Sequence, residues 1–138
     1  MRELLVVANQ TLGDQSLLER VRACIKDGPC RIHIVVPATP LAEHLTWVEG
    51  EARALAKRRL ESALVQFRCL GADVTGVVGD GNPILAIEDA LREGRFDEIV
   101  VSTLPPGISR WLRLDLPSRV AGRFRLPVTH VVARPEAA

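Results

Sequence analysis

The residue types in this sequence that are best suited to chemistry lie between positions 100 and 120, in the stretch VVSTLPPGISRWLRLDLPSRV. An apolar run there ends in two hydroxyl side chains, and a glycine and a serine–arginine pair follow. These residues are Ser102, Thr103, Gly107, Ser118 and Arg119, with Arg110 and Arg113 between them. Hydroxyl groups, guanidinium forks and glycine amides bind phosphate or carboxylate oxygens. The stretch therefore predicts an anion site, and the alternative is that its arginines form only a solvated basic surface.

Other kinds of catalytic or metal chemistry find little support in the sequence. The turn after the first apolar run, ANQTLGDQ, has one glycine where a dinucleotide site needs several. The two lysines, Lys26 and Lys57, lie in expected helices and exclude a P-loop. His33 and His130 lie in expected strands, no Gly-x-Ser-x-Gly is present, and no cluster has metal-ligand spacing. We expect no catalytic residue and no metal, so an enzyme is the least favoured class.

Composition indicates one ordinary globular domain over residues 1–138. Hydrophobic residues make up 47% and charged residues 25% of the chain, and the net charge of +1 argues against nucleic acid as a partner. No apolar run approaches the roughly 20 residues that span a bilayer. The opening MRELLVVA does not resemble a signal peptide, so we expect a cytoplasmic protein. Cys24, Cys30 and Cys69 are then expected to be reduced packing residues, with any redox role open.

Short apolar runs alternate with segments of helical period along the whole chain. Strands are expected at 3–8, 31–37, 73–79, 97–103 and 127–133, and helices at 14–27, 49–70, 83–93 and 116–124, with mainly loop at 38–48. Asp14 and Asn82 are expected helix N-caps, Asp115 is suited to cap the last helix, and Gly71 is an expected left-handed C-cap. Strands that are apolar at nearly every position need cover on both faces. The sequence therefore predicts an α/β fold with a doubly wound, five-stranded parallel sheet.

Ligands of such sheets bind beyond the carboxyl ends of the strands, where the strand order reverses. The candidate segments are residues 8–11, 36–39, 79–82 and 102–114. This argument predicts where a ligand binds, and it leaves the ligand itself open.

At the fourth strand and the loop and helix after it, the chain resembles the universal stress protein family, which is similar to this chain in strand–helix order over nearly its whole length. The fold of that family belongs to the adenine-nucleotide alpha-hydrolase-like group. ATP-binding members carry Gly-x2-Gly-x9-Gly-Ser/Thr after that strand. Here Gly107 matches the second glycine and Ser118 the final hydroxyl, while Leu104 and Pro117 replace the other two glycines. Asn9 stands where the family has an aspartate that holds adenosine. GDGNPILAIEDAL and LPVTHVV are similar to the family's third-helix and last-strand patterns.

The resemblance implies a universal-stress-like homodimer that binds ATP or another adenine nucleotide without catalysis. The implied nucleotide-binding residues are Ala8, Asn9, Ile34, Ser102, Thr103, Gly107, Ser118 and Arg119, with Arg110 and Arg113 as added phosphate clamps. The dimer would form through residues 127–133, from Pro127 to Ala133, because an apolar edge strand needs cover.

A nucleotide-free scaffold is the alternative of a different class. Pro117 removes an amide donor, and Leu104 brings a side chain where a backbone should approach phosphate. The loop 103–116 also contains many apolar residues, including Ile108, Trp111 and Leu114, which could close the cleft. The sequence leaves open whether this loop is a rebuilt anion site or a plug.

Overall fold

The apolar runs form one parallel sheet with the strand order β3-β2-β1-β4-β5, which confirms the predicted fold class. The computed structural model describes residues 1–38 and 49–134, so most of the loop expected at 38–48 lies outside the described residues. The strands are β1 (Arg2–Val7), β2 (Cys30–Pro37), β3 (Asp73–Gly79), β4 (Glu98–Thr103) and β5 (Val128–Val132). Their bounds differ from the expected ones by one residue or less at each end.

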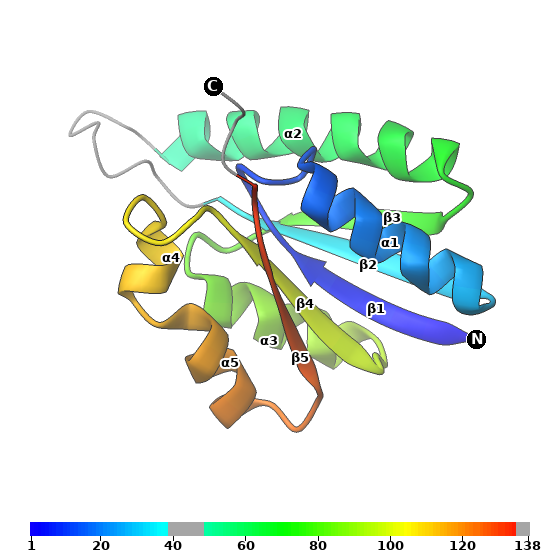
Figure 1. Cartoon of the computed structure of the whole chain (residues 1–138). Coiled ribbons are helices and arrows are strands. Elements are labelled where there is room, and N and C mark those ends of the chain that lie inside the picture. Colours follow the sequence, from blue (N-terminus) through cyan, green and yellow to red (C-terminus); the bar gives the residue numbers. More distant parts are fainter. Residues whose placement is uncertain (39–48, 135–138) are drawn as a thin grey trace.

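Helices cover both faces of the sheet, as Figure 1 shows. The described helices are α1 (Gln15–Asp27), α2 (Glu49–Cys69), α3 (Pro83–Glu93), α4 (Arg110–Arg113) and α5 (Leu116–Arg123). The buried side chains divide into two clusters, one beneath α1 and α2 and the other beneath α3, α4 and α5. The strand order therefore reverses between β1 and β4, which pair in parallel from Leu4 with Glu98 to Val7 with Val101.

The two-residue period of the strands decides which cluster each side chain joins. In β1, Leu4 and Val6 pack toward α1 and α2, while Leu5 and Val7 pack toward α3 and α5. All four have no exposed surface. Burying one such side chain contributes about 1.5–3 kcal/mol, so β1 anchors both layers of the core.

The expected helix ends are confirmed by their hydrogen bonds. The Asp14 carboxylate accepts from the Ser16 amide at 2.9 Å, and the Asn82 side chain accepts from the Ile84 amide at 3.0 Å. Pro83 begins α3, where a missing amide hydrogen costs nothing. Gly71 follows α2 with a φ of +95°, the left-handed conformation expected of a C-terminal glycine.

The segment between β4 and α5 differs from the loop that the sequence predicts. Residues 110–113 form the short helix α4, and the Ser109 hydroxyl accepts from the Leu112 amide at 3.2 Å. Asp115, which looked suitable as a cap for the last helix, has a φ of 55° and makes no side-chain capping bond. Its left-handed backbone instead lies at the turn between α4 and α5.

A buried carboxylate organises the amino ends of the strands. Glu98 begins β4 and accepts hydrogen bonds from Arg2, from Arg20 at 2.8 Å and from the Thr129 hydroxyl at 2.6 Å. Burial opposes its charge, but the Thr129 hydrogen bond and the Arg20 charge outweigh burial and lower the pKa of Glu98. The network joins β1, α1, β4 and β5 at the end of the sheet opposite the expected ligand site.

Candidate functional site

The carboxyl ends of β1 and β4 bring together several of the predicted site residues. Ser102 and Thr103 are the last residues of β4, and each is only 1% exposed. The Ser102 hydroxyl lies 2.6 Å from the Thr11 hydroxyl, and the Thr103 hydroxyl lies 2.8 Å from Nε2 of His130. These hydroxyls therefore fix the loop after β1 and the end of β5, and in this conformation they already have partners.

Asn9 lies just after β1 and uses both ends of its amide group. Nδ2 donates to the Pro37 carbonyl at 2.8 Å, and Oδ1 accepts from Nη1 of Arg59 at 2.5 Å. Asn9 thus ties the end of β2 to the middle of α2. Sequence reasoning missed Arg59, because it lies in a helix as one of several basic residues and no motif marks it.

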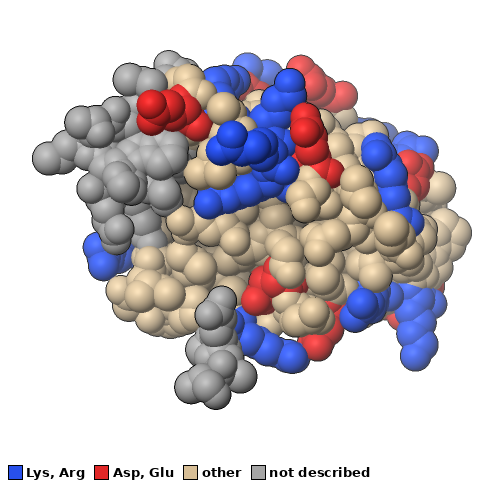
Figure 2. Space-filling view, turned by 90° about the horizontal axis from the view of Figure 1, so that it is seen from above, with Lys and Arg blue, Asp and Glu red and all other residues tan. Residues whose placement is uncertain are grey.

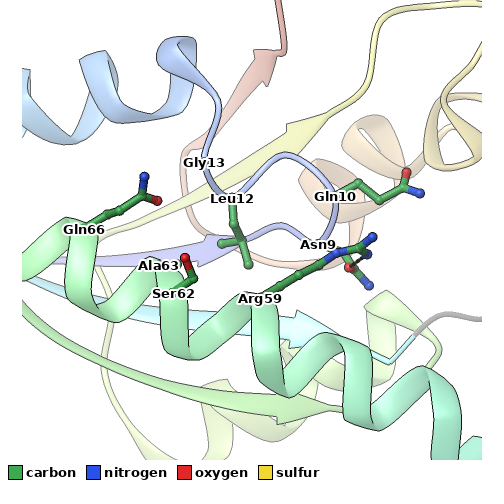
Figure 3. Close-up of a pocket in the computed structure, with 8 residues that line it drawn as sticks. All are labelled: Asn9, Gln10, Leu12, Gly13, Arg59, Ser62, Ala63 and Gln66. Carbon is green, nitrogen blue, oxygen red and sulfur yellow. Dashed lines mark hydrogen bonds between the residues drawn. The ribbon is translucent and has the colours of Figure 1, made fainter.

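A polar pocket of about 220 Å³ lies between α2 and the loop after β1, as Figure 3 shows. Its lining consists of Asn9, Gln10, Leu12, Gly13, Arg59, Ser62, Ala63 and Gln66. Five of these eight residues carry amide, hydroxyl or guanidinium groups, and Leu12, Gly13 and Ala63 add apolar surface. Such a lining suits a small polar ligand that carries negative charge.

Arg59 is the charged group of this pocket, and it is half-buried. Burial lowers the pKa of Arg59, and the neighbouring charge of Arg58 lowers it further. Within residues 1–38 and 49–134, no carboxylate forms an ion pair with the Arg59 guanidinium. A partly desolvated cation is stabilised by an incoming anion, so the Arg59 guanidinium favours phosphate or carboxylate groups in this pocket.

The surface around α2 adds to this positive field. Figure 2, which views the face that carries α1 and α2, shows Lys and Arg side chains gathered on it. Four basic residues lie within two turns of α2, namely Arg53, Lys57, Arg58 and Arg59. Neighbouring cations attract anions and accelerate their encounter with the protein.

The comparisons with known proteins agree with this architecture. No family model matches the chain, and no curated protein matches its sequence. Among solved structures, a universal stress protein family protein from Arabidopsis thaliana with AMP bound matches at a TM-score of 0.66 and 12% identity, covering 99% of this chain and 94% of that one. The fold is that of the universal stress proteins.

Two further structures support the same assignment. The universal stress protein of Archaeoglobus fulgidus matches at a TM-score of 0.58 and 16% identity, covering 95% of this chain and 93% of that one. A protein of the universal stress protein family from Burkholderia pseudomallei matches at 0.59 and 18%, covering 93% of each chain. The family resemblance drawn from the sequence is thus confirmed at the level of the fold.

The segment that resembles the universal stress protein glycine motif lies on the surface after β4. Gly107 is exposed with a φ of +94°, and its carbonyl accepts from the Arg113 guanidinium at 3.3 Å. Ser118 and Arg119 are exposed on α5. The side chain of Arg110 lies outside the described part of the structure. Gly107, Ser118 and Arg119 are therefore accessible, and Arg113 contacts Gly107 through its guanidinium.

Two predicted residues lie within the core of the universal stress protein fold. Ala8 has no exposed surface, and its amide donates to the Val35 carbonyl at 3.3 Å. Ile34 also has no exposed surface and packs beneath α1 and α2. In this conformation the structure does not bring Ile34 to the pocket with Asn9.

The apolar residues of the segment after β4 divide between core and surface. Trp111 and Leu116 are 9% and 3% exposed and pack in the cluster beneath α3 and α5. Ile108 and Leu114 are 65% and 52% exposed. Part of the segment is therefore anchored on the sheet, and part presents apolar side chains to solvent.

No metal centre or membrane helix is found in the part of the chain that the structure describes. Over residues 1–38 and 49–134, no group of three or more His, Cys, Asp or Glu side chains could hold a metal ion. Over the same residues, no helix is both long enough and apolar enough to cross a membrane.

Proposed function

We propose that this universal-stress-like protein binds an adenine nucleotide, or a related phosphorylated small ligand, beyond the carboxyl ends of β1 and β4, and does so without catalysis. The observation that carries the proposal is the half-buried guanidinium of Arg59, which lies beside Asn9. Among the described residues, Arg59 has no carboxylate partner. The AMP bound to the Arabidopsis protein of the same fold supports the choice of ligand class.

The proposed contacts extend those implied by the family resemblance. Asn9 and Arg59 hold one end of the ligand, and the exposed Gly107, Ser118 and Arg119 lie on the side where the family motif places phosphates. Arg110 and Arg113 act as additional clamps in this proposal. In this proposal Ser102 and Thr103 position the loops around the ligand, because their hydroxyls already bond to Thr11 and His130.

Isothermal titration calorimetry with ATP, ADP and AMP tests the proposal. We expect saturable heat with at least one nucleotide at up to millimolar concentration, and a rise in melting temperature, because a ligand that binds only the folded state stabilises it. No heat and no thermal shift with any of the three nucleotides would overturn the proposal.

A pair of neighbouring arginines gives a matched control for the titration. Arg59→Gln removes the guanidinium of the pocket, and we expect about ten- to hundredfold weaker nucleotide affinity, since a hydrogen bond to a charged group contributes about 1.5–3 kcal/mol. Arg58→Gln removes the same charge from the exposed side of α2 and should change the affinity by about twofold or less. If both substitutions weaken the affinity equally, the arginines act through the overall positive charge of α2 and Arg59 makes no specific contact with the nucleotide.

A nucleotide-free interaction module remains the second candidate, and the exposure of Ile108 and Leu114 favours it. Exposed apolar side chains on one segment are typical of surfaces that bind another protein. Arg119→Ala separates the two functions, since it weakens nucleotide binding in the first and leaves any small-molecule binding unchanged in the second. Nucleotide-dependent protection of Ser118 from hydrogen exchange would count against the interaction module.

A further inference from the structure

Two of the three cysteines meet at the end of the sheet opposite the candidate ligand site. Cys24 lies in the last turns of α1, and Cys30 begins β2. Gly28 has a φ of +145° and, with Pro29, reverses the chain between them. The two cysteines are 1% and 8% exposed, whereas Cys69 at the end of α2 is exposed.

The contact between the two sulfur atoms is much closer than thiols normally make. Sγ of Cys24 lies 2.6 Å from Sγ of Cys30. Heavy atoms that are not bonded prefer separations of about 3.5–4.0 Å. The sulfur atoms of a disulfide are about 2.05 Å apart. The fold thus holds the two thiols nearer to bonding distance than to ordinary contact, and their repulsion disappears if a bond forms.

We propose that Cys24 and Cys30 form an intramolecular disulfide that fastens the end of α1 to the start of β2. A low-molecular-weight disulfide such as oxidised glutathione supplies the oxidising equivalents. One cysteine thiolate attacks it, breaking its S–S bond and releasing one glutathione thiolate. The second cysteine thiolate then attacks the sulfur of the mixed disulfide and releases the second. Two protein thiols are oxidised by two electrons, and one oxidised glutathione becomes two reduced molecules.

The surroundings of the pair determine how the reaction proceeds. Burial, followed by the hydrogen bond with Cys24, raises the pKa of Cys30 to about 12, while the charges of Arg2 and Arg20 act in the opposite direction. Few thiolates therefore form in the folded protein at neutral pH, so exchange in the native state is slow. The bond forms most readily while the chain folds, and the finished structure then protects it from reduction.

Refolding in a glutathione redox buffer tests the pairing without depending on the rate in the native state. The exposed Cys69 is first replaced, Cys69→Ser, and the chain is unfolded and then refolded in mixtures of reduced and oxidised glutathione. After denaturation and alkylation, we expect a product that is 2 Da lighter than the reduced chain and carries no alkyl group. Peptide mapping should show a bond between Cys24 and Cys30. A monomer in which both cysteines are alkylated, or carry glutathione, would overturn the proposal.

A stability measurement provides the second readout. The oxidised Cys69→Ser chain should melt about 5 °C above its reduced form, because the bridge restricts the unfolded chain, and dithiothreitol should reverse the difference. Cys24→Ala and Cys30→Ala in the same background should show no such difference. An oxidised form that melts at or below the temperature of the reduced form would show that the fold does not accommodate the bridge.

Discussion

At the scale of single residues, the sequence locates some members of the proposed site and misses others. Asn9 and Gly107 could be located in advance, because each stands in a segment similar to a known family motif. Arg59 could not, since helical periodicity shows only that it lies on a polar stripe of α2. The loop after β1 makes that stripe one wall of a pocket, and the chain must fold before loop and helix meet.

Asp115, in contrast, is a residue whose expected role as a helix cap is absent from the structure. An acidic residue just before a helix favours an N-cap, but its backbone has the left-handed conformation and its carboxylate caps nothing. The sequence did not indicate the short helix α4, which ends two residues before Asp115. Propensity cannot identify a helix of four residues whose sequence, Arg-Trp-Leu-Arg, has no turn signal.

The buried Glu98 predicts an acid-sensitive fold. Its pKa lies below the ordinary value of 4.5 in the folded state, so its contribution to stability is fully present above that pH and is lost as pH falls through the folded value. Burial likewise lowers the pKa values of His33 and His130 from 6.5. As the pH falls, these histidines are protonated in the unfolded chain before they are protonated in the folded protein. The free energy of unfolding therefore begins to fall below about pH 6.5.

Urea unfolding between pH 3 and 8 would measure this dependence, with Glu98→Gln as the test variant. At neutral pH we expect Glu98→Gln to lower the free energy of unfolding by about 2 kcal/mol, because Arg2 and Arg20 lose a shared buried partner but are themselves partly exposed. The variant should also show a flatter stability curve below pH 4.5. A curve parallel to that of the wild type would mean that other carboxylates account for the acid dependence.

At the scale of helices and strands, sequence patterns predict most of the structure because the relevant physics is local. Asp14, Asn82 and Gly71 each satisfy the backbone of a helix end within a few residues of their own position. The alternation of Leu4, Leu5, Val6 and Val7 between two core clusters requires only the period of a strand. The close packing of α3 on the sheet, in contrast, depends on a glycine whose role becomes clear only in three dimensions.

Gly79 permits that close packing. A Cβ added there would lie 2.8 Å from the Cβ of Ala86 in α3 and 3.2 Å from Cγ1 of Val35. We expect Gly79→Ala to lower the free energy of unfolding by about 1–3 kcal/mol, since α3 must move away from β3. Chemical denaturation of the purified variant measures the change.

Gly122 offers the matched control. It lies in α5, and an added Cβ would have no atom within 4 Å. Gly122→Ala should therefore raise the stability by up to about 1 kcal/mol through helix propensity alone. If both substitutions stabilise the protein, α3 does not pack against β3 as tightly as the distances indicate.

At the scale of the whole molecule, β5 is an edge strand, as the sequence argument anticipated. Val132 is 38% exposed, and Val128 and Val131 are half-buried. An exposed apolar edge readily pairs with another strand, and pairing of β5 with its copy in a second chain remains our proposal for a homodimer.

Light scattering after size exclusion tests the dimer. We expect a mass of twice the 15.1 kDa chain at micromolar concentration. Val132→Glu should shift the mass toward that of one chain, because it places like charges at the pairing edge. Val65→Glu, at an exposed position on α2, should leave the mass unchanged. A single-chain mass for the wild type would refute the dimer.

The interior position of β4 in the sheet determines how rarely its backbone becomes open to solvent. β4 pairs with β1 on one side and β5 on the other, and all six of its residues are buried. Amides in such a strand exchange with solvent only when the whole chain unfolds, whereas surface loops open locally at small free-energy cost. The strand ends therefore act as a fixed frame, and among the described residues we expect adaptation to a ligand in loops such as 8–14 and 104–115.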